Sequence, residues 1–335
     1  MKVFVRKRLM VYARLILMRL FKAVIVLFLI VIFNFLLIQL APGDPAAILA
    51  GEAGAADQEF LNQLRERFGL DQPMYVQLWR YISGIAMLDF GYSYRLGVPV
   101  FDLIMDRLPA TLLLTGTAFV LSLVLGIVAG SMAAARVKKP SGSLIMALAL
   151  VFYATPLFWV ALMSVMVFSV YLGWLPAYGL YTVGAGHTGF ALVLDVVKHL
   201  VLPATTLALF FMAIYTRMTR TSMLDAAQQD YVKTARAKGL KPSIIQRRHV
   251  LRNALLPIIT LAGLQAGQMV GGAILTETVF AWPGIGRLMF EALQQRDYNL
   301  LLGIFFFSAA LVIVFNIITD LVYSLADPRI KKGAA

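Results

Sequence analysis

The sequence predicts an all-α integral membrane protein with about six transmembrane helices. Of its 335 residues, 60% are hydrophobic and 14% are charged, whereas a soluble domain is about half apolar and about a quarter charged. The apolar residues form continuous runs, which is typical of membrane helices, while the strands of a membrane barrel alternate apolar and polar residues. Lysine and arginine concentrate in alternate loops, as the positive-inside rule expects of a chain with several spans.

Six runs have the roughly 20 residues that a helix needs to cross a hydrocarbon core of about 30 Å. A basic segment over residues 1–20 precedes the first span at 21–40, which is too long for the apolar part of a signal peptide. An outer loop over 41–110 follows, then a transmembrane core over 111–325 and a tail over 326–335. The later spans are expected near residues 111–134, 144–172, 196–215, 255–280 and 300–325.

The distribution of basic residues orients these spans. Of the 30 Lys and Arg residues, 22 lie in the N-terminal segment together with Lys22 at the start of the first span, the loop after the second span, the loop over 216–254 and the tail. The positive-inside rule places these segments, and with them both termini, in the cytoplasm. The net charge of +13 is therefore a topology signal, and we expect no binding of nucleic acid.

The residues that would carry catalysis are missing or scattered. The chain has no cysteine, which excludes disulfides, thiolate metal sites and cysteine nucleophiles. Its three histidines, His187, His199 and His249, lack metal-ligand spacing. No Ser-His-Asp or His-Glu-x-x-His pattern stands out. We therefore expect no catalytic residue, no metal site and no cofactor bound by this chain.

The long outer loop is expected to hold two short helices. Asp57 is a candidate N-cap for the first, and Phe60, Leu64 and Phe68 would form its apolar stripe. Pro73 can open the second helix. Amphipathic pieces of this kind fit either packing at the membrane interface or contact with a partner outside the cell, and the sequence leaves both open.

The loop over residues 216–254 predicts a helix, a tight turn and a second helix. Gly239 can take the positive φ that ends a helix, and Pro242 can open the next one, expected over 243–253. A short rigid element like this fits a groove of another protein, and a basic loop resting on anionic lipid is the alternative. The helical period before the turn runs through Leu224, Gln228, Tyr231 and Ala235.

The fifth span carries Gly263, Gly267 and Gly271 at four-residue spacing. Glycines at this spacing form one smooth stripe along which a second helix can approach closely. The stripe is interpreted either as a moving contact between the pore helices of two subunits or as static packing inside this chain. We slightly favour the second interpretation, because small-residue stripes are common in membrane helices.

The loop after the fourth span also resembles a known family. Residues 230–240, Asp-Tyr-Val-Lys-Thr-Ala-Arg-Ala-Lys-Gly-Leu, and 249–257, His-Val-Leu-Arg-Asn-Ala-Leu-Leu-Pro, are similar to the cytoplasmic loop of ABC importer permeases, more narrowly of the B-type permeases in the dipeptide and oligopeptide branch. Lys233-Thr234-Ala235 stands where the wider family has Glu-Ala-Ala, as in that branch. Further similar segments are 41–45, 68–73, 88–93, 107–111, 277–286 and 325–329.

The resemblance implies a type I ABC importer permease fold with a cytoplasmic coupling helix, in a bacterial inner membrane. Such a chain forms half of a translocation pathway, with a second homologous permease, two ABC ATPase subunits that bind ATP and Mg, and an extracytoplasmic solute-binding protein. The substrate could be a dipeptide, a longer peptide, glutathione or a nickel chelate. The residues implied in coupling to the ATPases are Asp230, Tyr231, Thr234, Ala235, Ala237, Gly239 and Leu240.

The energy source separates this expectation from two others. The sequence contains no Gly-Lys pair and hence no P-loop, so ATP would bind another chain. A secondary transporter driven by an ion gradient would place ionisable groups inside its spans. The main candidates are Asp320 near the cytoplasmic end of the sixth span and Glu277 near the outer end of the fifth. A membrane scaffold that transports nothing is the third alternative.

Overall fold

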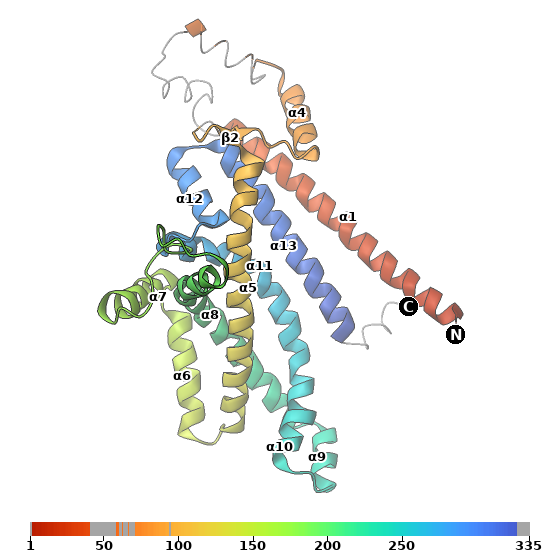
Figure 1. The fold of residues 1–335 in the computed structure, drawn as a ribbon. Coiled ribbons are helices and arrows are strands. Elements are labelled where there is room, and N and C mark those ends of the chain that lie inside the picture. Colours follow the sequence, from red (N-terminus) through yellow and green to blue (C-terminus); the bar gives the residue numbers. More distant parts are fainter. Residues whose placement is uncertain are drawn as a thin grey trace. The chain divides into compact units, whose positions relative to one another are not determined.

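The computed structural model describes residues 2–40, 58–59, 62, 66, 71–93 and 95–326. Most of them are helical (Figure 1), and β1 (Tyr92–Ser93) and β2 (Val98–Pro99) form a short antiparallel ribbon. Contacts divide the chain into two compact units. The first comprises Met1–Asp106 and Glu291–Ala310, and the second comprises Arg107–Phe290 and Leu311–Ala335.

The first unit holds the long helix α1 (Lys2–Leu40) and the short helix α4 (Met74–Ala86). The rings of Phe35 and Tyr81 lie 6.1 Å apart, and Gln39 Nε2 donates a hydrogen bond of 3.0 Å to Gln77 Oε1. Pro73 immediately precedes α4, which confirms the expected start of the second outer-loop helix. The expected first helix, with its cap and apolar stripe, falls largely on residues outside those that the structure describes.

The second unit is built around the contacts of three long helices. Side chains of all three, among them Leu114, Leu207 and Ile258, form its largest buried apolar cluster. The cluster lies on α5, α8 and α11. From α5 onward, the described elements are α5 (Val100–Ala135), α6 (Pro140–Ala154), α7 (Leu157–Ser164), η1 (Val165–Tyr171), α8 (Gly189–Ala227), α9 (Asp230–Ala237), α10 (Pro242–Ile244), η2 (Ile245–Leu251), α11 (Arg252–Val279), α12 (Ile285–Gln295) and α13 (Tyr298–Ala326).

The expected number of spans is confirmed. Within the described residues, five helices are long and apolar enough to cross a membrane, and the bent pair formed by α6 and α7–η1 makes six if it counts as one span. The helices α5 and α8 extend well beyond the apolar segments expected at 111–134 and 196–215. Hydropathy marks where lipid contact ends, whereas the backbone hydrogen bonds of a helix continue into water.

The expectation of one continuous helix over residues 144–172 is wrong. The chain bends by 101° between Pro140–Ala154 and Leu157–Tyr171. Thr155 is extended, with φ −83° and ψ 134°, and Pro156 follows at φ −57° and ψ 132°. A proline ring disfavours helical geometry at the residue before it and removes a backbone donor, so a Thr-Pro pair inside an apolar run can end a helix.

A close crossing of α5 and α8 rests on two glycines that the sequence analysis did not single out. A Cβ at Gly126 would overlap Tyr215, and a Cβ at Gly130 would lie 2.5 Å from Thr219 Cβ. Neither position has room for a Cβ atom, so only glycine lets the two backbones approach this closely. Gly126 and Gly130 form a G-x-x-x-G motif, and that spacing is the signal that would have located this contact.

Candidate functional site

The residues after α8 form a helical hairpin, defined here as α9, the turn at Gly239, α10 and η2. The hairpin starts where Gln229 turns extended, with φ −70° and ψ 151°, between the end of α8 at Ala227 and the start of α9 at Asp230. The expectation that one helical period runs from Leu224 through to Ala235 is therefore wrong, because two separate helices cover this stretch.

A small apolar cluster seats α9 on the rest of the second unit. Val232 and Ala235, one helical turn apart, are 0% and 4% exposed. They pack in one cluster with Ile245 of the hairpin itself and with Ala134 of α5, Met223 of α8 and Ala254 of α11. The hairpin is therefore held by the ends of three membrane helices, through contacts that exclude water.

The turn after α9 has the geometry of a Schellman motif. Gly239 takes φ +71°, its N–H donates to Arg236 O at 2.9 Å, and the N–H of Leu240 donates to Ala235 O at 3.3 Å. This pair of bonds satisfies the last carbonyls of the helix and requires positive φ at the residue after the cap. The expected helix-ending role of Gly239 is confirmed.

The second arm of the hairpin is continuous with a membrane helix. Pro242 opens α10 as expected, but the helix does not end near residue 253. It passes through the π-helical turns of η2 into α11, and Pro242–Val279 forms one candidate span of 38 residues that includes Pro257. A displacement of the hairpin tip therefore acts directly on a helix that crosses the membrane.

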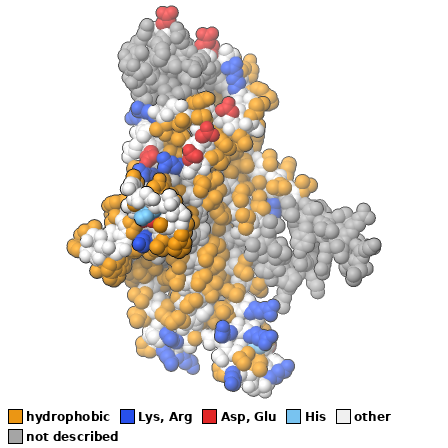
Figure 2. All heavy atoms as spheres, in the orientation of Figure 1, with side chains coloured by type: hydrophobic (Ala, Val, Ile, Leu, Met, Phe, Trp, Pro, Cys, Tyr) orange, Lys and Arg blue, Asp and Glu red, His pale blue; other side chains and the backbone are white. Residues whose placement is uncertain are grey.

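The exposed face of the hairpin combines apolar and basic side chains. Tyr231, Leu240 and Ile244 are 38%, 37% and 42% exposed. Figure 2 shows Lys and Arg side chains gathered at this tip, around α9 and α10. Of the residues implied in coupling, Asp230, Tyr231, Thr234, Ala237, Gly239 and Leu240 are exposed, whereas Ala235 is buried.

The burial of Ala235 changes what this residue can do. Its side chain faces the cluster with Met223 and Ile245 and has no surface from which to contact another chain. Val232, which shares this cluster, did not stand out in the sequence. The signal for it was the apolar pair Val232 and Ala235 at a spacing of three, which marks the buried side of a short helix.

The glycine stripe of α11 faces another helix of the same chain over part of its length. A Cβ at Gly263 would overlap the side chain of Thr319, and a Cβ at Gly267 would lie 3.0 Å from Val312 Cγ1, both on α13. A Cβ at Gly271 would have no atom within 4 Å among the described residues. Gly263 and Gly267 therefore serve close packing inside this chain.

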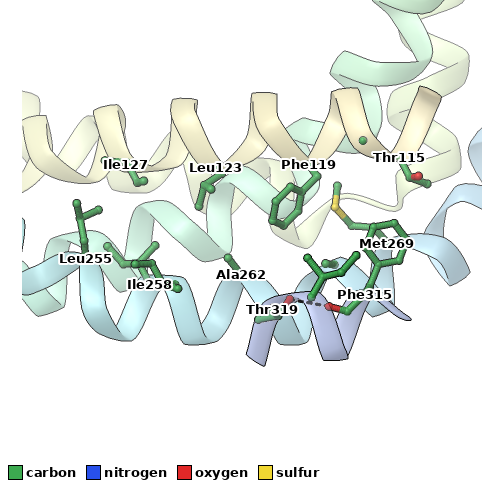
Figure 3. A pocket seen from close by; sticks show the side chains of 15 residues that line it. Thr115, Phe119, Leu123, Ile127, Leu255, Ile258, Ala262, Met269, Phe315 and Thr319 are labelled. Carbon is green, nitrogen blue, oxygen red and sulfur yellow. Dashed lines mark hydrogen bonds between the residues drawn. The ribbon is translucent and has the colours of Figure 1, made fainter. Parts of the chain in front are cut away.

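An apolar cavity of about 290 Å³ lies beside this contact, between α5, α11 and α13. Figure 3 shows Phe119 and Leu123 of α5 on one side and Ile258 and Ala262 of α11 on the other. Thr319 Oγ1 at its edge donates to Phe315 O at 2.8 Å, within its own helix. With this hydroxyl already paired, the cavity fits an apolar group better than a polar solute.

A second group of residues surrounds Glu277, and all of them except Arg287 belong to the family-like segments 107–111 and 277–286. We call Thr111, Glu277, Trp282, Gly284 and Arg287 the Glu277 cluster. Glu277 is 0% exposed. Its carboxylate accepts hydrogen bonds from Thr111 Oγ1 at 2.7 Å and from the backbone N–H of Arg287 at 3.0 Å. Trp282 Nε1 donates to Ala110 O at 2.8 Å, which ties the loop before α12 to α5.

The geometry gives Glu277 a capping role. Its carboxylate lies at the first turn of α12, where free backbone N–H groups and the helix dipole stabilise a negative charge. A Cβ at Gly284 would overlap this carboxylate, so the loop passes close to it only because residue 284 is glycine. These contacts of Glu277, Thr111 and Trp282 join elements of the second unit to one another. The side chain of Asp320, the other acid considered for ion coupling, lies outside the described residues.

Comparison with known proteins places these features in a family. A model described as the binding-protein-dependent transport system inner membrane component matches residues 126–332, and the model of its N-terminal part matches 12–115. The dipeptide transport system permease DppB of Alkalihalophilus pseudofirmus is 40% identical over 314 residues, covering 90% of this chain and 94% of that protein. The oligopeptide permease AppB of Bacillus subtilis is 41% identical over 304 residues, with the same coverage.

Other matches agree. The dipeptide permease DppB of Escherichia coli is 38% identical over 319 residues, with 90% of this chain and 94% of that protein covered. A solved structure of the MetNI methionine ABC transporter in an inward-facing conformation matches with a TM-score of 0.55 at 16% identity, over 67% of this chain and 96% of that one. The expected permease fold and the resemblance to the peptide branch are thereby confirmed, and the chain belongs to the family of binding-protein-dependent transport system inner membrane components.

Proposed function

We propose that this chain is the permease subunit of an ATP-driven ABC importer and forms half of a translocation pathway for di- or oligopeptides or related small solutes. The observation that carries the proposal is the helical hairpin. It is seated on three membrane helices, exposes a mixed apolar and basic tip, and continues without a break into α11. Relatives of about 40% identity that bear the names of dipeptide and oligopeptide permeases support the substrate class.

The hairpin couples ATP hydrolysis to movement of the membrane helices. Two ABC ATPase subunits, which bind ATP and Mg, receive the exposed residues Asp230, Tyr231, Thr234, Ala237 and Leu240 in their grooves. Gly239 sets the angle between the two arms, and Ala235 fixes α9 to the membrane helices from its buried side. The chain itself carries out transport and no catalysis, since hydrolysis takes place on the partner subunits.

The remaining partners follow from the half-pore role. A second homologous permease completes the pathway, and an extracytoplasmic solute-binding protein delivers the solute. The basic hairpin then faces the cytoplasm of a bacterial cell, both termini lie on the same side, and the spans sit in the inner membrane. Gly271, which has no close neighbour among the described residues, is the part of the glycine stripe available for contact with the second permease.

Uptake into proteoliposomes tests this function. The chain is reconstituted with its neighbouring permease, ATPases and binding protein, and entry of labelled dipeptides is followed with ATP enclosed and ionophores collapsing every ion gradient. We expect uptake that requires ATP and all partners and survives the ionophores. Gradient-driven uptake by this chain alone would identify a secondary transporter, and absence of uptake under both conditions would identify a scaffold.

A further inference from the structure

A second cavity, of about 550 Å³, lies between α6, α8 and α11. Its wall is mostly apolar, with Met146 and Leu150 from α6, Ile214 and Met218 from α8, and Leu261 from α11. All of these residues belong to the second unit. The cavity differs from the apolar one in Figure 3, because polar side chains reach it from α6, α8 and α11.

The polar side chain on α11 is Gln265. It lines the cavity and is only 8% exposed, and its Oε1 is buried without a hydrogen-bond donor among the described residues. It lies midway along α11, about 20 Å from either end at a rise of about 1.5 Å per residue. An unpaired amide is unfavourable in such an apolar place, so a polar group kept there points to a ligand that pairs with it.

The other polar side chains define the rest of the ligand. Arg217 and Thr221 of α8 line the same cavity, as does Tyr153 of α6, and all three are exposed. The guanidinium of Arg217 stays charged at any physiological pH and suits a carboxylate. The cavity therefore offers an acceptor for an N–H group, a cation for an anionic group and an apolar wall for a variable side chain.

We propose that this cavity is a binding site for the transported solute that reaches from Gln265 inside the membrane to Arg217 at its cytoplasmic edge, with Gln265 accepting a hydrogen bond from a peptide N–H and Arg217 attracting the peptide carboxylate. The proposal rests on the importer function given above and adds the residues that hold the solute. Because one amide and one guanidinium recognise only backbone groups, and the wall is apolar and unspecific, the site accepts peptides of many sequences.

A phospholipid with an ethanolamine headgroup has the same combination of an ammonium, an anion and apolar chains. Its headgroup, however, stays at the membrane interface, about 15 Å from the middle of the hydrocarbon core. Gln265 lies at mid-helix, where an acyl chain offers no N–H group. The depth of Gln265 thus favours a solute in transit over a lipid.

Photo-crosslinking in the complete importer tests the site. The probe is alanyl-benzoylphenylalanine, a dipeptide with a photoreactive side chain, and the crosslinked residues are mapped by mass spectrometry. In the unsubstituted importer we expect crosslinks on α6, α8 and α11 around the cavity. In Gln265→Leu we expect about tenfold less crosslinking there, the effect of losing roughly one hydrogen bond.

The matched control is Gln268→Leu. Gln268 is exposed, lies three residues further along the same helix and does not line this cavity. We expect its crosslinking to stay within about twofold of the unsubstituted importer, because no bond to the solute is lost. Arg217→Gln should weaken crosslinking of the dipeptide. It should not change crosslinking of a second probe, the dipeptide with a C-terminal amide, because that probe has no carboxylate.

Three results overturn the proposal. In the first, the dipeptide is taken up but crosslinks outside the cavity. In the second, Gln265→Leu and Gln268→Leu behave alike. In the third, Gln265→Leu lowers uptake only in vesicles that contain phosphatidylethanolamine, which would identify a lipid site. Absence of uptake by the unsubstituted importer would instead count against the proposed function, so failure of the site and failure of the function are distinguishable.

Discussion

The helical hairpin precedes α11, the Glu277 cluster includes the last turn of the same helix, and both contain segments that resemble the family. The hairpin exposes most of its characteristic residues and holds itself in place with a few small apolar side chains such as Val232 and Ala235. The Glu277 cluster buries its acid completely and pairs it with Thr111 and α12. The hairpin therefore leaves a surface free for a partner, whereas the polar groups of the Glu277 cluster form hydrogen bonds between helices of one chain.

This difference shows that a shared sequence motif does not by itself mark a binding site. Substitutions in the Glu277 cluster should act on stability first and on transport only as a result. Substitutions at the hairpin should separate into those that unseat α9 and those that leave the fold intact and weaken docking. The four predictions below test this division.

The largest effect is expected from Ala235→Arg. The guanidinium would enter a cluster with no acceptor for it, at a cost of about 4 kcal/mol, and α9 would leave its seat. We expect transport to be lost while insertion into the membrane is retained, as measured by uptake and by the amount of protein recovered from membranes. The matched control, Ala237→Arg, places the same charge on the exposed side and should leave the unfolding temperature unchanged. Equal stability of the two variants would contradict the buried seat.

Glu277→Ala should destabilise the second unit by about 3 kcal/mol. It removes the acceptor for Thr111 and for the first turn of α12, and it leaves buried donors unpaired. The measurement is the apparent unfolding temperature of the purified protein in detergent. Asp225→Ala, which removes an exposed carboxylate of α8, is the control and should have little effect. If Glu277→Ala were as stable as the control but lacked uptake, Glu277 would act directly in transport, and the purely structural role of the cluster would be wrong.

Gly239→Pro should cost about 2 kcal/mol at the turn and abolish coupling. Proline cannot adopt φ +71°, and it lacks the N–H that donates to Arg236 O. Gly239→Asn should retain most of the transport, because asparagine tolerates positive φ. Uptake and binding of the purified ATPases, measured on both variants, test this. If the proline variant bound ATPase and transported normally, the angle of the hairpin would be irrelevant to coupling.

The features that depend on local chemistry could be predicted from the sequence. Apolar runs and the distribution of basic residues predicted the spans, and Gly239 and Pro242 predicted the turn and the second arm of the hairpin, because a positive φ and a fixed φ belong to single residue types. The bend at Thr155-Pro156 was visible in principle, but hydropathy does not register where a backbone donor is missing. The lengths of the helices beyond the membrane were missed because hydropathy reports lipid contact and not backbone hydrogen bonding.

The features that depend on tertiary contacts could not be predicted. Glu277 near a span end is compatible with ion coupling as well as with capping, and only its distances to Thr111 and Arg287 assign the second role. The burial of Ala235 depends on where α8 ends. The sequence pattern continues with helical spacing across Gln228 and Gln229, so it gave no sign that α8 ends there. Gln265 is one amide in an apolar run, and its unpaired oxygen emerges only when its neighbours on α6 and α8 are known.

The smallest effect is expected from Tyr231→Ala, and it is the one that isolates docking. Tyr231 is exposed on the hairpin, so its loss should leave the unfolding temperature unchanged. It should weaken binding of the ATPase subunits about fivefold, which corresponds to roughly 1 kcal/mol, because aromatic side chains contribute strongly to interfaces. Titration of purified ATPase onto the permease pair in nanodiscs measures this. Tyr178→Ala, which removes a more exposed tyrosine outside the hairpin, should bind normally, and equal binding by both variants would remove Tyr231 from the docking surface.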